Sequence, residues 1–64
     1  MTRAEFWGRK MLSGDSRRVG FDEALDGALS ECVSSGPESE FTRVIRFTDG
    51  SSIHLGLDGS LTWQ

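Results

Sequence analysis

The fold is decided by residues 41–64, which read FTRVIRFTDGSSIHLGLDGSLTWQ. Apolar and polar side chains alternate along this stretch, and a period of two residues is typical of half-buried strands. Asp-Gly pairs at residues 49–50 and 58–59 interrupt the alternation where tight turns would reverse the chain. The pattern predicts three consecutive strands, over about residues 41–47, 51–57 and 60–63.

The faces of these strands indicate the length of each turn. A two-residue turn would place Ile45 opposite His54 and would mix apolar with polar residues on one face. A three-residue loop with a left-handed Gly50 places Ile45 opposite Ile53 instead, and Gly59 allows the same loop in the second turn. We therefore predict an antiparallel meander in the order 1-2-3 with one apolar inner face. That face comprises Phe41, Ile45, Phe47, Ile53, Leu55, Leu61 and Trp63.

The N-terminal residues carry the signals of a short helix. Thr2 and Glu5 have the spacing of a capping box, in which each side chain accepts from a free backbone N–H at the helix start. Gly14 provides the left-handed residue with which helices commonly end. These signals predict a helix over about residues 3–12.

A second helix follows from the strongest periodicity in the chain. Apolar residues between Phe21 and Val33 recur at the i, i+3, i+4 and i+7 spacing of an amphipathic helix. Gly36-Pro37 would end such a helix. We predict a helix over about residues 21–34, followed by the polar linker SSGPESE that leads to the first strand.

Together these elements predict a single α+β domain over residues 1–64, with both helices on one face of the three-stranded sheet. We expect the second helix to cover the sheet and the first to lie alongside it. Gly8 borders the apolar stripe of the first helix and would allow the second helix to approach closely. Gly27 lies on the polar side of the second helix, where it costs helical stability without an evident benefit.

Composition limits the kind of function. The chain has 64 residues, of which 36% are hydrophobic, so it can form a thin core but not a deep substrate cavity. Its single cysteine, Cys32, cannot form an internal disulfide, which favours a reducing compartment. No segment has the length of a membrane span or the apolar run of a signal peptide. We expect a cytoplasmic, monomeric protein that does not bind membranes.

The residues that could support catalysis are separated from one another. His54, the single histidine, falls on the outer sheet face with Val44 and Thr62 as its expected neighbours, rather than a carboxylate or a nucleophile. Cys32 falls in the apolar stripe of the second helix and is expected to be buried and inert. We therefore predict no catalytic residue, no metal site and no cofactor, and we do not expect an enzyme.

Charge is distributed unevenly along the chain. Residues 1–18 carry five basic and two acidic residues, whereas residues 19–40 carry six acidic residues and no basic one. Carboxylates therefore dominate the exposed side of the second helix, and a strip of one sign is complementary to a basic protein surface. The residues predicted to contact a partner are Asp22, Glu23, Asp26, Ser30 and Glu31. The alternative interpretation is a solvated helix face, in which case the contact would lie elsewhere, with the outer sheet face around Arg46, His54 and Thr62 next in line.

Two other functions stay open. The basic N-terminal residues could contact nucleic acid while Phe6 or Trp7 stacks on bases, although a net charge of −3 argues against direct nucleic-acid binding. These basic residues are Arg3, Arg9, Lys10, Arg17 and Arg18, of which Arg18 could also pair with Asp22. An exposed strand edge could instead serve a structural or oligomeric role.

A small acidic domain without catalytic residues resembles in its layout the inhibitors that phages encode against host nucleic-acid-handling machinery, in particular anti-CRISPR proteins. The resemblance covers the whole chain through its size, charge and layout, and the basic first 18 residues differ from the more uniformly acidic members. It implies a viral, non-enzymatic inhibitor that binds a Cas effector and occludes the basic surface that otherwise accepts DNA.

Overall fold

A computed structural model describes residues 1–13 and 18–64, without the side chains of Arg18 and Val19. The predicted helix end at Gly14, the basic residue Arg17 and the predicted pairing of Arg18 with Asp22 lie outside the described part. The elements are α1 (Arg3–Leu12), α2 (Arg18–Glu31), β1 (Ser34–Pro37), β2 (Thr42–Arg46), β3 (Ser52–Gly56) and β4 (Leu61–Trp63).

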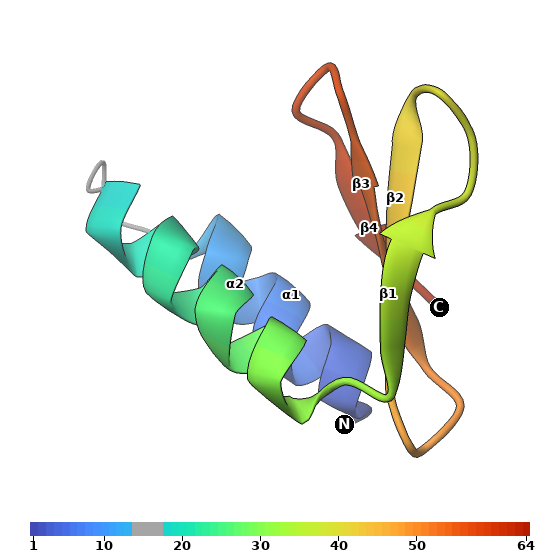
Figure 1. Ribbon diagram of the computed structural model, residues 1–64. Helices are drawn as coiled ribbons and strands as arrows, with labels where there is room; N and C mark the ends of the chain where they lie inside the picture. Colours follow the sequence, from blue (N-terminus) through green and yellow to red (C-terminus); the bar gives the residue numbers. More distant parts are fainter. Residues whose placement is uncertain (14–17) are drawn as a thin grey trace.

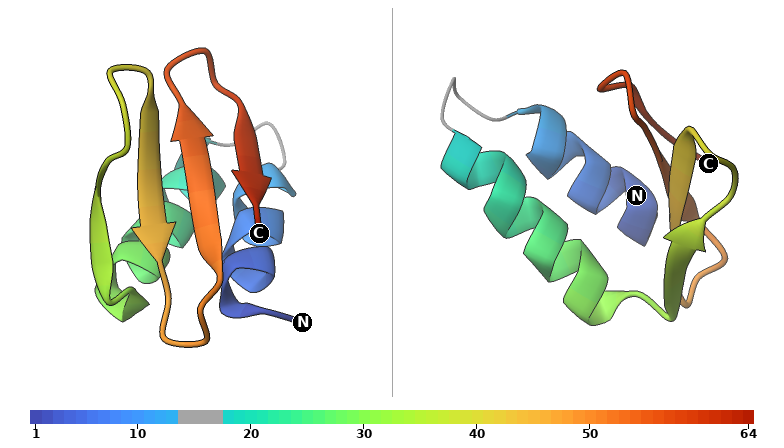
Figure 2. Two further views of the ribbon diagram at one scale, coloured as in Figure 1. Left: turned by 90° about the vertical axis from the view of Figure 1, so that its right-hand side faces the viewer. Right: turned by 45° about the horizontal axis from the view of Figure 1, so that its top comes forward.

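The predicted α+β class is confirmed, because two helices lie on one face of an antiparallel sheet (Figure 1). The predicted number of strands is wrong, since the sheet has four strands in the order β1-β2-β3-β4. The three strands expected from the alternating pattern are β2, β3 and β4, and they follow one another in the predicted order. The additional strand β1 lies at the edge of the sheet, beside β2 (Figure 2).

Strand β1 occupies residues for which the sequence predicts a linker. Ser34 pairs with Arg46 and Pro37 pairs with Arg43, in antiparallel register. Backbone groups make this pairing, and next to it the Val33 N–H donates to the Arg46 oxygen at 2.9 Å. A strand of two Ser, one Gly and one Pro has no period-two signal, and Pro is tolerated because β1 is an edge strand.

Helix α1 runs over the predicted span and has half of the predicted capping box. The Glu5 N–H donates to Thr2 Oγ1 at 3.0 Å, whereas the Glu5 carboxylate accepts from Arg9 Nε at 2.9 Å instead of the cap amide. Helix α2 begins and ends three residues earlier than predicted. Its end is set by the sheet, because residues from Ser34 onward pair with β2, and Gly36-Pro37 lies inside β1.

Both turns are three-residue loops, as the strand faces require. Gly50 and Gly59 have φ values of 87° and 90°, in the left-handed region that disfavours a Cβ. Ile45 lies opposite Ile53, so the two largest fully buried side chains meet across β2 and β3. The register predicted from the sequence is therefore confirmed.

The loop between β2 and β3 also caps α1. Asp49 Oδ2 accepts from the Arg3 N–H at 2.8 Å, and Ser51 Oγ accepts from the Ala4 N–H at 3.0 Å. Free amides at the start of a helix need such partners, and here they come from residues 46 and 47 positions away. The Asp49 carboxylate accepts hydrogen bonds from the Ser51 hydroxyl and from the Arg3 and Ser51 amides. These bonds lower the pKa of Asp49 to about 2, and the bond from the Ser51 hydroxyl has the largest effect.

Helix α1, rather than α2, makes most of the helix contacts with the sheet. Helix α1 lies against β3 and β4, so the expectation that the second helix is the main cover is wrong, while α2 packs beside α1 (Figure 2). The buried core contains Ala4, Met11, Ala24, Ala28, Ile45, Phe47 and Ile53. Phe41, which is predicted to face this core, is 65% exposed. The helices lean away from the end of the sheet where β2 begins, and therefore leave Phe41 uncovered (Figure 1).

Each helix carries a glycine against a tryptophan ring. Gly8 lies against Trp63 of β4, and Gly27 lies against Trp7 of α1; at either position a Cβ would overlap the ring. The close neighbour of Gly8 is thus a strand residue, not the second helix as predicted. Gly27, for which the sequence shows no benefit, lets the Trp7 ring pack close to α2.

Candidate functional site

Three of the predicted partner contacts are exposed carboxylates on α2. Asp22, Glu23 and Asp26 are separated by one, three and four positions, which gathers them toward one side of the helix. Ser30 is exposed on the same side, where its Oγ donates to the Gly27 oxygen at 2.9 Å. We call these four residues the α2 acidic face: Asp22, Glu23, Asp26 and Ser30.

Glu31, the fifth predicted contact, is already in an ion pair. Arg3 Nε lies 2.5 Å from Glu31 Oε2 and Arg3 Nη2 lies 2.6 Å from Glu31 Oε1, which forms a two-point bridge between α1 and α2. The hydrogen bond from Arg3 lowers the pKa of Glu31, and the same bond raises the pKa of Arg3. The α2 sequence has no basic neighbour for Glu31, but the fold supplies one from α1, so Glu31 is less available to a partner.

The described basic residues of α1 are engaged within the domain. Arg9 pairs with Glu5 at 2.9 Å, and the Lys10 Nζ lies 4.8 Å from the Phe6 ring centroid and 5.5 Å from that of Trp7. The two rings also pack edge to face, with their centroids 5.0 Å apart. Nucleic-acid binding needs available cations and open aromatic faces. This arrangement therefore does not favour the nucleic-acid alternative.

The outer sheet face carries a Ser-His-Glu array that the sequence did not predict. His54 has the expected cross-strand neighbours Val44 and Thr62. Its Nε2, however, lies 3.1 Å from Ser52 Oγ, and its Nδ1 lies 3.4 Å from Glu38 Oε2. The expectation that His54 has neither a carboxylate nor a nucleophile-type side chain beside it, apart from its cross-strand neighbours, is therefore wrong. Ser52 could have been found from its i−2 position on the same strand, but Glu38 could be placed only by predicting β1.

The order of groups in this array matches a hydrolytic triad, but their burial does not suit that chemistry. A nucleophilic hydroxyl must reach its substrate, and Ser52 is only 7% exposed. Val44 is 3% exposed although it lies on the sheet face away from the helices. We interpret the array as a polar cover for this face, in which Glu38 ties the segment after β1 to His54 on β3.

Other chemistry has little support among the described residues. Cys32 is half-buried against the core, and its Sγ donates to the Leu29 oxygen at 3.1 Å. Among residues 1–13 and 18–64, no group of three His, Cys, Asp or Glu side chains could hold a metal ion. Within the same residues, no helix has both the length and the apolar character needed to cross a membrane.

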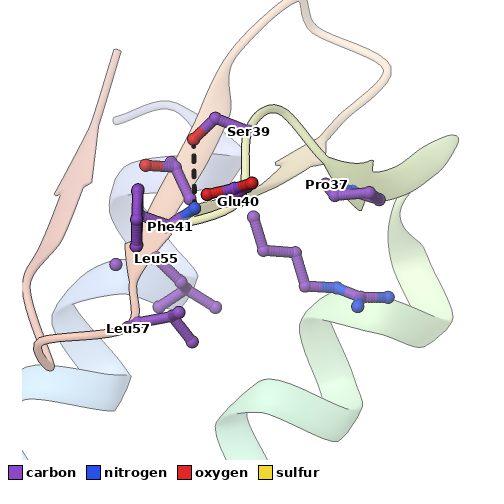
Figure 3. Close-up of a pocket in the computed structure, with 9 residues that line it drawn as sticks. Pro37, Ser39, Glu40, Phe41, Leu55 and Leu57 are labelled. Atoms are coloured by element: carbon purple, nitrogen blue, oxygen red, sulfur yellow. Dashed lines mark hydrogen bonds between the residues drawn. The ribbon is translucent and has the colours of Figure 1, made fainter.

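An apolar patch lies at the uncovered end of the inner sheet face. Phe41 is 65% exposed and Leu57 is 78% exposed, and the Leu57 N–H donates to the Phe41 oxygen at 2.9 Å. Both border a recess of about 290 Å³ whose walls also include Pro37 and Leu55 (Figure 3). We call these four residues the Phe41–Leu57 patch. The sequence shows that they are apolar, but not that the helices stop short of them.

In the part of the chain that the structure describes, the α2 acidic face and the Phe41–Leu57 patch are both exposed surfaces. No protein-family model matches the chain. No curated protein and no solved structure matches it either. The α2 acidic face and the Phe41–Leu57 patch are therefore the features that bear on function.

Proposed function

We propose that this chain is a non-enzymatic, protein-binding inhibitor whose α2 acidic face occupies a basic surface of a partner protein. The observation that supports this proposal is the exposure of Asp22, Glu23 and Asp26 on one side of α2. Clustered carboxylates present negative charge and hydrogen-bond acceptors much as phosphates do, so they compete with nucleic acid for a basic groove. The inhibitor acts by occupancy and needs no chemical step.

The specific form of the proposal is an anti-CRISPR protein that binds a Cas effector and occludes its nucleic-acid-binding surface. A net charge of −3 favours approach to such a surface. The domain exposes 4391 Å² of surface, and a standard interface takes roughly 800 Å² from each partner. A contact of roughly 800 Å² would therefore cover about a fifth of the domain surface.

Removal of charge from α2 tests the proposal. The variant Glu23→Gln/Asp26→Asn loses two negative charges, and its folding should be unaffected because both side chains are exposed. The matched control, Thr48→Lys/Gln64→Lys, changes the net charge by the same amount at exposed positions outside α2. Each protein is titrated into purified Cas effector–guide complexes that hold a labelled target duplex, and release of the duplex is measured.

We expect the parent and the control to release DNA stoichiometrically and the α2 variant to be weaker by about tenfold or more. Binding should also weaken as salt increases, since the contact is electrostatic. Equal release by the α2 variant and the parent at low salt would place the contact elsewhere on the domain. Failure of the parent with every complex would refute the Cas-effector form of the proposal.

A further inference from the structure

The end of the inner sheet face that the helices leave uncovered contains the most exposed apolar side chains of the sheet. The left view of Figure 2 shows the turn between β3 and β4 and the start of β2 extending beyond the helices. Phe41 immediately precedes β2 and Leu57 immediately follows β3, and a backbone hydrogen bond of 2.9 Å joins them. Contiguous exposed apolar side chains, unlike scattered single ones, commonly mark a contact surface.

Two recesses border this pair and can receive side chains. The recess in Figure 3 has Phe41, Leu55 and Leu57 as its apolar wall. A second recess shares Phe41 and Leu57 and continues along Gly56 toward Asp58. Recesses lined by exposed aromatic and aliphatic side chains can receive the anchor side chains of a partner.

The charges around the patch indicate the chemistry of the partner. Glu40 lines the first recess and Asp58 lines the second, while Arg43 is the basic residue of the first. The Ser60 backbone N–H donates to the Asp58 carboxylate and lowers its pKa, so Asp58 is ionised at neutral pH. With a net charge of −3, a second copy of the chain or an anionic membrane would be repelled, whereas a basic segment would be attracted.

We propose that the Phe41–Leu57 patch binds the apolar side chains of a basic amphipathic segment of a partner protein. The inference rests on the proposed function and supplies the apolar half of the same contact. Basic side chains of the segment meet Glu40 and Asp58 beside the patch, while its apolar side chains fill the two recesses. An amphipathic helix presents both kinds of side chain at i, i+3 and i+4 spacing, so a helical segment fits this description.

The probe for this proposal is a labelled amphipathic helical peptide made only of Leu and Lys, with a Leu/Glu peptide of the same pattern as its control. Affinity is measured by fluorescence anisotropy, and the bound surface is mapped by amide chemical shifts of the isotope-labelled protein. We expect the Leu/Lys peptide to shift the amides around Phe41 and Leu57, and the Leu/Glu peptide to bind much more weakly.

Variants of the patch test which surface carries the apolar contact. Phe41→Ser/Leu57→Ser should lower the affinity of the protein for the Leu/Lys peptide by about tenfold or more, since truncation of hot-spot side chains typically has such an effect. Val33→Ser is the matched control, because Val33 is 61% exposed and apolar but outside the patch. Should the double variant not fold, Leu57→Lys at the 78% exposed position introduces a repelling charge by a single change.

The two proposals fail in different ways. Unchanged affinity of Phe41→Ser/Leu57→Ser, with strong loss in Glu23→Lys/Asp26→Lys, would overturn the patch and leave the acidic face intact. The reverse result would support the patch and refute the α2 contact. Amide chemical-shift changes confined to residues outside the patch would also overturn the patch proposal. A dimer of the parent protein that dissociates in the Phe41→Ser/Leu57→Ser variant would overturn it too, because the patch would then bind a second copy.

Discussion

Gly27→Ala should change the stability of the domain in opposite directions through helix propensity and through packing. In an exposed helix this change stabilises by roughly 0.5–1 kcal/mol, because Ala has the higher helix propensity. Gly27 lies against the Trp7 ring, however, and a Cβ there would overlap it. Overpacking of this kind costs about 1–3 kcal/mol. The difference predicts a net loss of about 1 kcal/mol, or a melting temperature lower by about 4–8 °C for a domain of this size.

Thermal unfolding followed by far-UV circular dichroism measures this change without relying on tryptophan fluorescence. Ser30→Ala is the matched control, because Ser30 is exposed on the same helix and touches no aromatic ring; it gains helix propensity and loses one exposed hydrogen bond to the Gly27 oxygen, so stability should change by less than about 0.5 kcal/mol. In a Trp7→Leu background, Gly27→Ala should become stabilising, since the clash is removed. A higher melting temperature for Gly27→Ala in the parent chain would refute the close packing of Trp7 on α2.

Two further changes test the core and the cap of α1. The folded-state pKa of Asp49 is about 2, below its ordinary value of 3.8, so its contribution to stability is present above about pH 4 and is lost as pH falls toward 2. Asp49→Asn should reduce the fall in melting temperature across that range, and an unchanged fall would contradict this role. Ile53→Ala truncates a fully buried side chain and should cost about 2–5 kcal/mol in chemical denaturation; a loss below 1 kcal/mol would show that Ile53 is not central to the core.

Features that depend on near neighbours in the sequence were predictable. The Thr2 cap of α1 and the left-handed Gly50 and Gly59 follow from local backbone requirements, and the alternating pattern then determines which strand residues face each other. Strand β1 was not predictable by this route, because its pairing uses backbone groups and its side chains carry no pattern. The α2 acidic face was visible in the sequence, but the arginine that neutralises Glu31 comes from another helix.

The exposure of the Phe41–Leu57 patch could not be predicted from the strand pattern, for a different reason. Alternation assigns Phe41 to the inner face, and that assignment says nothing about how far a covering helix extends along the strand. Only the tilt of the helices relative to the sheet determines which inner-face residues are buried (Figure 1). Phe41, just before β2, and Leu57, just after β3, therefore continue the face that carries the core and still remain 65% and 78% exposed.

The cap that the β2–β3 loop places on α1 also affects how the domain opens. The first turn of a helix usually frays on its own, but the Arg3 and Ala4 amides are held by Asp49 and Ser51. The Ala4 hydrogen bond is buried, so exchange of this amide should require the hairpin and the helix to separate, and its rate should follow those of β2 and β3 amides. The N-terminal turn thereby joins the cooperative unit of the sheet, and a contact that spans 46 positions must close before α1 is fully formed.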